Sequence, residues 1–143
     1  MLELLETIAA SLGLPFCYGA VSDLNIQADK LASKTDKLLF HEGYLSGTLS
    51  KDAQGAYSPN YDLRLWIMMR SDLADLPLTH KARLMVMKQV MYQILNRLEE
   101  TEGIEAVTAL RFEEGVKMKA TDNPLDGIRL YGSVKVDEDT LCL

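Results

Sequence analysis

The sequence has few of the features from which secreted, metal-binding or membrane proteins are built. Its two cysteines, Cys17 and Cys142, lie near opposite ends and match no metal-ligand spacing. In a chain without an export signal we expect two reduced thiols, and a bridge is conceivable if the terminal strands are neighbours. No run of about 18 apolar residues occurs, which excludes a predicted transmembrane helix. The opening MLELLETIAASLGLPF carries acid where a signal peptide needs base, so we expect a cytoplasmic protein.

Positive charge is also scarce. Twenty-one acidic residues against fifteen basic ones give a net charge of -6, and the Lys and Arg are scattered along the chain. Phosphate binding needs a clustered basic surface that releases counterions. Nucleic acid is therefore not expected as the main partner, although a basic patch that forms only in an oligomer stays open.

The motifs of common catalytic and cofactor sites are absent: GxxxxGK[ST], GxGxxG, GxSxG and HExxH do not occur. Neighbouring strand residues point to opposite faces, so His41 and Glu42 should not share a site. We interpret His41 as a partly exposed structural residue, and His80 as a residue that helps a helix start or faces water. The acidic runs 113–115 and 137–139 suit a charged turn and a solvated tail better than a metal site. We therefore predict no enzyme, no cofactor and no metal.

What the sequence does contain is the pattern of an ordinary globular protein. Its 143 residues, 48% hydrophobic and 25% charged, fit one domain spanning 1–143. Apolar residues recur at helical spacing over 2–12, before Gly13, and over 80–102, where Thr79 is a suitable N-cap and Gly103 a suitable stop.

Strands are predicted from alternation and β-forming composition. The run 37–50 is interrupted near Gly43, and 51–60 has the composition of a hairpin loop. Residues 22–36 have only a weak pattern and are interpreted as an irregular excursion. The expected strands cover 16–21, 37–50, 61–70, 107–112 and 128–136. The order predicts an α+β fold: a mostly antiparallel sheet with a short N-terminal helix and one long helix, both packed on one face.

The stretch YDLRLWIMMR (61–70) raises a specific question. Its odd-numbered residues form one apolar face, yet Trp66 and Met68 share the other face with Arg64 and Arg70. With both helices on one side, we expect this face to be exposed in a single chain. Because aromatic residues, Met and Arg are enriched in protein interfaces, we predict that Arg64, Trp66, Met68 and Arg70 form a contact surface with another chain.

The succession of elements resembles the tail terminator and tail completion proteins of long-tailed bacteriophages and prophages. The similarity runs through LLETIAASLGL, the hairpin around SKDAQGAYSPN, YDLRLWIMMR leading into HKARLMVMKQVMYQILNRL, and LDGIRLYGSVKV. It implies a structural protein without an active site, which assembles as a ring, caps the tail tube and joins it to the head. The implied partners are further copies of the chain and tail tube or head-completion proteins, within an assembled virion.

Two alternatives remain. The opening ELLETIAASLGLPF, the size and the negative charge are also similar to those of small acidic, dimeric secretion chaperones, although these usually end in a helix rather than in a strand such as IRLYGSVKV. A small acid-base enzyme is the third interpretation, and it rests on His41 alone. The number of associated copies separates a ring from a dimer.

Overall fold

The computed structural model describes residues 1–20, 23, 31, 35–43, 46–72, 74–118 and 124–137. The helices of this part are α1 (Leu2–Ser11) and α3 (Pro77–Glu100). The strands are β1 (Phe16–Gly19), β2 (Lys37–Glu42), β3 (Gly47–Lys51), β4 (Tyr57–Arg70), β5 (Ile104–Met118) and β6 (Leu125–Val136). The predicted α+β class is confirmed, with a short N-terminal helix and one long helix.

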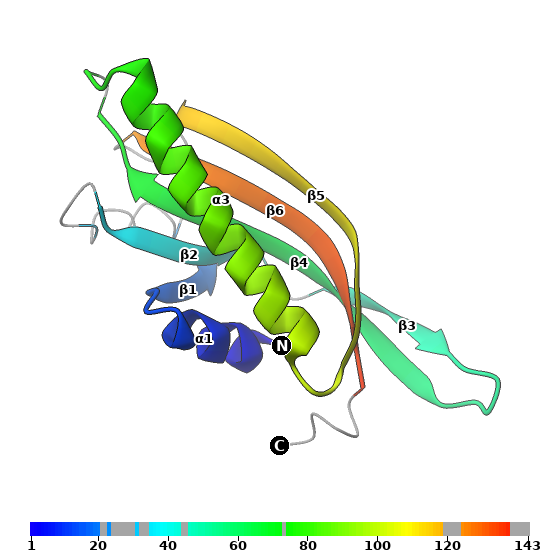
Figure 1. Cartoon of the computed structure of the whole chain (residues 1–143). Helices are drawn as coiled ribbons and strands as arrows, with labels where there is room; N and C mark the ends of the chain where they lie inside the picture. The colour runs from blue at the N-terminus through cyan, green and yellow to red at the C-terminus, as the bar shows by residue number, and fades with distance from the viewer. Residues whose placement is uncertain are drawn as a thin grey trace.

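The strands form one sheet in the order β1-β2-β4-β6-β5, and β3 pairs with the first part of β4. The β1–β2 pair is parallel and the other pairs are antiparallel. Strand β4 is the centre of the sheet, because β2, β3 and β6 all pair with it. The hairpin of β3 and the start of β4 extends away from the rest of the sheet (Figure 1).

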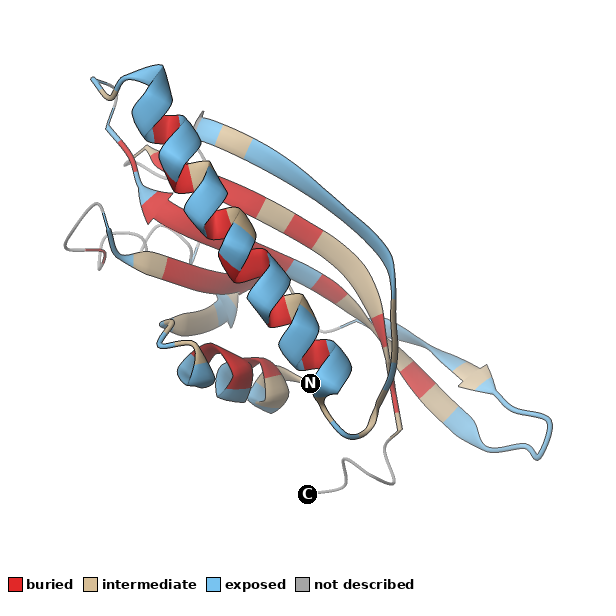
Figure 2. Cartoon of the chain, in the orientation of Figure 1, coloured by how far each residue is buried: buried red, intermediate tan, exposed pale blue. Residues whose placement is uncertain are grey.

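One face of the sheet carries the main core. Alternation along β4 places Leu63, Leu65 and Ile67 on this face, where α3 and α1 lie across it (Figures 1 and 2). Most of the buried residues of α3 are spaced three or four positions apart and face the sheet, as its amphipathic pattern predicts. They are His80, Arg83, Met87, Val90, Met91, Ile94 and Leu98.

Element boundaries differ from the expectation at several points. Helix α3 starts at Pro77, with Leu76 rather than Thr79 as its N-cap, since proline suits the first turn of a helix. The predicted strand 37–50 is divided into β2 and β3, with Gly43 at φ 74° between them. Strand β5 is longer than predicted and includes 113–115, so the interpretation of that run as a turn was wrong.

None of the helices in the described part of the chain combines the length and the apolar character needed to cross a membrane.

Candidate functional site

The predicted contact residues on β4 lie in two different environments. Trp66 and Met68 are only 7% and 0% exposed, so the expectation that they are uncovered in a single chain was wrong. Arg64 and Arg70 are exposed. That these four residues contact another chain stays a prediction. The observation on which it was based, exposed apolar surface at Trp66 and Met68, does not hold.

A second, smaller core explains the burial of Trp66 and Met68. They pack with four other buried side chains and with the partly buried Cys17. The four are Leu31, Leu38, Phe40 and Leu125. The sequence carried one signal of this layer: KLLFHE places apolar residues on both faces of β2, which is typical of a strand that is covered on both sides. Leu31 lies in the weakly patterned excursion, which explains why the cover was not predicted.

Beside this core, aromatic rings and guanidinium groups alternate across the sheet. The Arg129 guanidinium carbon lies 4.9 Å from the Trp66 ring and 4.8 Å from the Tyr131 ring, and that of Arg111 lies 4.6 Å from Tyr131. Glu42 accepts a 2.7 Å hydrogen bond from the Trp66 indole N–H and is bound by two nitrogens of Arg129. Cation–π stacking of this kind fixes the long arginine side chains.

Trp66, Arg129, Tyr131 and Arg111 form a stack in which Glu42 neutralises the charge of Arg129. Burial acts to raise the pKa of Glu42, but the hydrogen bonds from Trp66 and Arg129 outweigh it, and the pKa is lowered. Arg111, at the other end, has no carboxylate within ion-pair distance in the described part of the chain. Arg64, Arg111 and Tyr131 line a shallow open hollow of about 430 Å³. The hollow is open to solvent.

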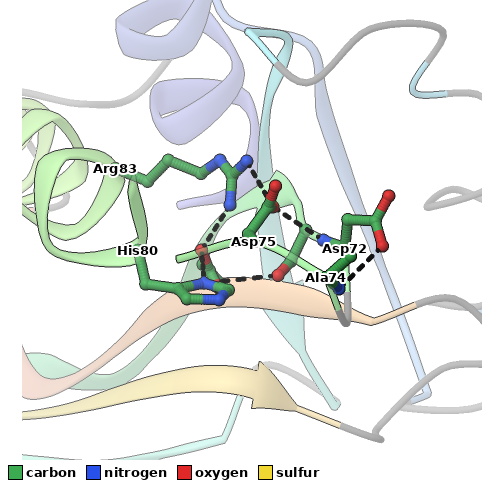
Figure 3. Close-up of polar contacts among 7 residues, drawn as sticks. Asp72, Ala74, Asp75, His80 and Arg83 are labelled. Atoms are coloured by element: carbon green, nitrogen blue, oxygen red, sulfur yellow. Dashed lines mark hydrogen bonds and ion pairs between the residues drawn. The ribbon is translucent and has the colours of Figure 1, made fainter. Parts of the chain in front are cut away.

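A buried polar cluster lies at the start of α3 (Figure 3). His80 Nδ1 lies 2.7 Å from an Asp126 carboxylate oxygen, and Arg83 donates hydrogen bonds to Asp126 at 2.9 Å and to Asp75 at 2.6 Å. Ser71 Oγ lies 3.5 Å from the same histidine nitrogen. The expectation that His80 faces water was wrong, since it is buried with Asp126 and Arg83.

This cluster ties three segments together. Asp126 belongs to β6, His80 and Arg83 to α3, and Asp75 to the connection that follows β4. Burial acts to lower the pKa of Arg83, but the hydrogen bonds to Asp126 and Asp75 outweigh it and raise the pKa. The arrangement fixes the start of α3 on the sheet. Because its charged groups are nearly closed to solvent, a substrate has no access to them.

His41 lies on the helix-covered face of β2 and is 1% exposed, whereas Glu42 lies on the opposite face, as predicted. The interpretation of His41 as partly exposed was wrong. Burial outweighs a backbone hydrogen bond with Asp62 and lowers the pKa, which keeps the ring neutral near pH 7. A neutral, enclosed imidazole without access to solvent offers no acid-base chemistry to a substrate.

A metal site needs several ligating side chains gathered around one point. Among the described residues, no group of three or more His, Cys, Asp or Glu side chains is arranged to hold an ion. The second acidic run, 137–139, lies outside the described residues except for Asp137.

The outer edge of β5 has no paired strand in the described part of the chain. This strand ends the sheet, and β6 is its strand partner in the described part of the chain (Figure 1). Leu110, Phe112 and Val116 are 42%, 48% and 46% exposed, and β5 is exposed along most of its length (Figure 2). On α3, Lys88 pairs with Glu114 and lies 5.5 Å from the Phe112 ring. This edge was not predicted from the sequence.

The features above are interpreted from the structure alone. No protein-family model matches the chain, and no curated protein matches it.

Proposed function

We propose that the protein is a non-enzymatic structural protein that acts by self-assembly, in the role of a phage tail terminator or minor tail protein. In this role it associates with itself, caps the tail tube and joins it to the head. The further partners are tail tube or head-completion proteins.

One observation carries the self-assembly proposal: the long outer edge of β5 with its exposed apolar side chains. A free strand edge presents N–H and C=O groups to which another chain can add a strand. Proteins that remain monomers usually protect such edges, and a row of exposed apolar residues on one strand marks an interaction surface. Leu110 and Phe112 supply such a row beside the strand's free backbone groups.

The helix beside β5 extends this surface. Tyr92 is 55% exposed and lies one turn along α3 from Lys88, whose ammonium group lies 5.5 Å from Phe112. Aromatic residues of this kind are enriched in interface cores. The proposed contact surface therefore comprises β5 and the flank of α3, in place of Trp66 and Met68.

Light scattering coupled to size exclusion tests this proposal over a wide range of protein concentration. We expect an assembly larger than a monomer in the native protein, and its loss in Phe112→Asp. Leu49→Asp is the matched control, because Leu49 is exposed on the projecting hairpin, away from β5. A strict monomer at every concentration would contradict the proposal.

A dimeric binding module, similar to the small acidic secretion chaperones, is the second candidate. Two-fold pairing through one edge, such as that of β5, closes with two chains, whereas a larger assembly needs a second surface as well. Growth beyond the dimer, or rings in electron micrographs, favours the tail role. An assembly that stops at two copies favours the binding module.

A further inference from the structure

The centre of β5 carries an unusual arrangement of charge. Arg111 and Glu113 flank Phe112, and the register with β6 is unbroken from Arg111 to Gly115, between two irregular stretches. Side chains alternate along this regular part. Arg111 and Glu113 therefore lie with Tyr131 on the face opposite α3, and Phe112 lies on the face covered by α3.

Both charged groups are without an ion-pair partner among the described residues. Arg111 stacks on Tyr131 but reaches no carboxylate there. Glu113 lies opposite Arg129 in the strand register, yet the Arg129 guanidinium is bound to Glu42 by hydrogen bonds of 2.6, 2.7 and 3.0 Å. One strand thus presents a positive and a negative group, two positions apart on the same face.

Symmetry restricts how two such strands can pair. In an antiparallel pair, the two strands are related by a two-fold axis normal to the sheet, which passes beside one residue of each strand. The residue just before that position in one copy then lies opposite the residue just after it in the second copy. Only an axis at Phe112 sets Arg111 opposite Glu113 of the second copy, and it does so twice. An axis at Arg111 or at Glu113 sets two like charges opposite each other, which destabilises a pair.

We propose that two copies of the chain pair antiparallel through β5, with Phe112 opposite Phe112 of the second copy. This inference rests on the proposed self-assembly and specifies its first contact. The pair joins the two sheets edge to edge, so the backbone groups of both outer edges are satisfied. The two Arg111–Glu113 pairs select this register over its neighbours, and the two Phe112 rings meet on the face that α3 covers.

Charge exchange tests the register. In Arg111→Glu and in Glu113→Arg, two like-charge contacts replace the two opposite-charge pairs, and we expect the dimer Kd to rise about tenfold. The double variant Arg111→Glu, Glu113→Arg restores both pairs with reversed sign, and its Kd should return towards that of the native protein. If Arg111→Glu weakened the dimer only through the lost contact with Tyr131, adding Glu113→Arg would not restore the Kd. Sedimentation measures Kd, and circular dichroism checks the fold of each variant.

Disulfide trapping gives a second, independent readout. Opposed residues of an antiparallel pair have Cα atoms about 4.5–5.5 Å apart, which suits a disulfide. In a background without Cys17 and Cys142, Phe112→Cys should form a covalent dimer on mild oxidation. Leu110→Cys is the control, since Leu110 is exposed on the same face but lies opposite Glu114 of the second copy.

The outcomes separate this inference from the proposed function. If the native protein associates but the double variant stays dissociated, or Leu110→Cys crosslinks more readily than Phe112→Cys, the register is overturned while self-assembly stands. If the native protein is a monomer throughout, both are overturned.

Discussion

At the scale of single residues, Trp66 joins two kinds of interaction. Its ring is buried in the smaller core and stacks on Arg129, while its indole N–H binds Glu42. We predict that Trp66→Ala lowers the free energy of unfolding by about 3–5 kcal/mol, because a large side chain leaves a cavity. Trp66→Phe should cost less, since most of the ring volume remains. Urea denaturation measures the free energy of unfolding of both variants. If Trp66→Ala abolished assembly without lowering that free energy, Trp66 would be an interface residue rather than a core residue.

His41 gives the protein a pH-dependent stability. The unfolded chain takes up a proton at His41 near pH 6.5, whereas the buried ring resists it because burial lowers its pKa. The unfolded state binds more protons, so stability falls as the pH drops below about 6.5. We predict a smaller loss between pH 7 and pH 5.5 in His41→Leu. Denaturant midpoints at both pH values measure it, and equal losses in the two proteins would contradict this assignment.

Asp126 holds the charged cluster at the start of α3. Asp126→Asn removes the negative partner of Arg83 and His80 in a buried site, and breaking such a pair costs about 3–5 kcal/mol. Asp62→Asn is the matched control, because the Asp62–Arg64 pair is 3.6 Å long and half-exposed. Its effect should stay within about 1 kcal/mol. Equal effects of the two substitutions on the unfolding free energy would show that the cluster contributes no more than a surface pair.

At the scale of elements, the projecting hairpin depends on one close approach of two backbones. A Cβ at Gly47 would collide with the carbonyl oxygen of Asn60 on β4. We predict that Gly47→Ala opens the β3–β4 pairing while the rest of the sheet stays folded. Hydrogen exchange should accelerate in β3 and remain slow in β6. Thr48→Ala is the control, and unchanged protection of β3 in Gly47→Ala would contradict the prediction.

The elements that the sequence revealed are those with two contrasting sides. Apolar periodicity located α1, α3 and β6, because each has a buried side and a more exposed one. It also located the centre of β4 from one apolar face, although Trp66 and Met68 on its other face are buried too. Strand β5 lacks this contrast over 108–114, where every residue is exposed, so only part of it was recognised. Its free edge is set by the strand order of the whole sheet, which local patterns do not contain.

The buried clusters were hidden for a related reason. His80 and Arg83 are visibly one turn apart, but their partner Asp126 belongs to a strand far along the chain. Likewise, the cover of Trp66 comes partly from Leu31, a lone apolar residue among polar neighbours. Such contacts follow from the tertiary fold and leave no periodic trace in the sequence.

At the scale of the whole molecule, a two-fold contact through β5 restricts the size of any assembly. A pair related by a two-fold axis uses the same surface on both copies, so a larger assembly must grow from dimers through a second surface. We predict an even number of copies in every stable species beyond the monomer. Native mass spectrometry counts them, and a dominant odd-numbered species would contradict two-fold pairing while leaving self-assembly intact.

The central place of β4 also governs how the chain folds during its synthesis. β4 must pair with β6 from Asn60 opposite Lys135 to Arg70 opposite Leu125, and β6 is the last strand of the described chain. A ribosome therefore releases β4 long before its neighbour on that side. Until then the nascent chain carries an open apolar strand, and closing the large loop to β6 slows folding. The middle of the sheet is therefore completed only after β6 has been synthesised.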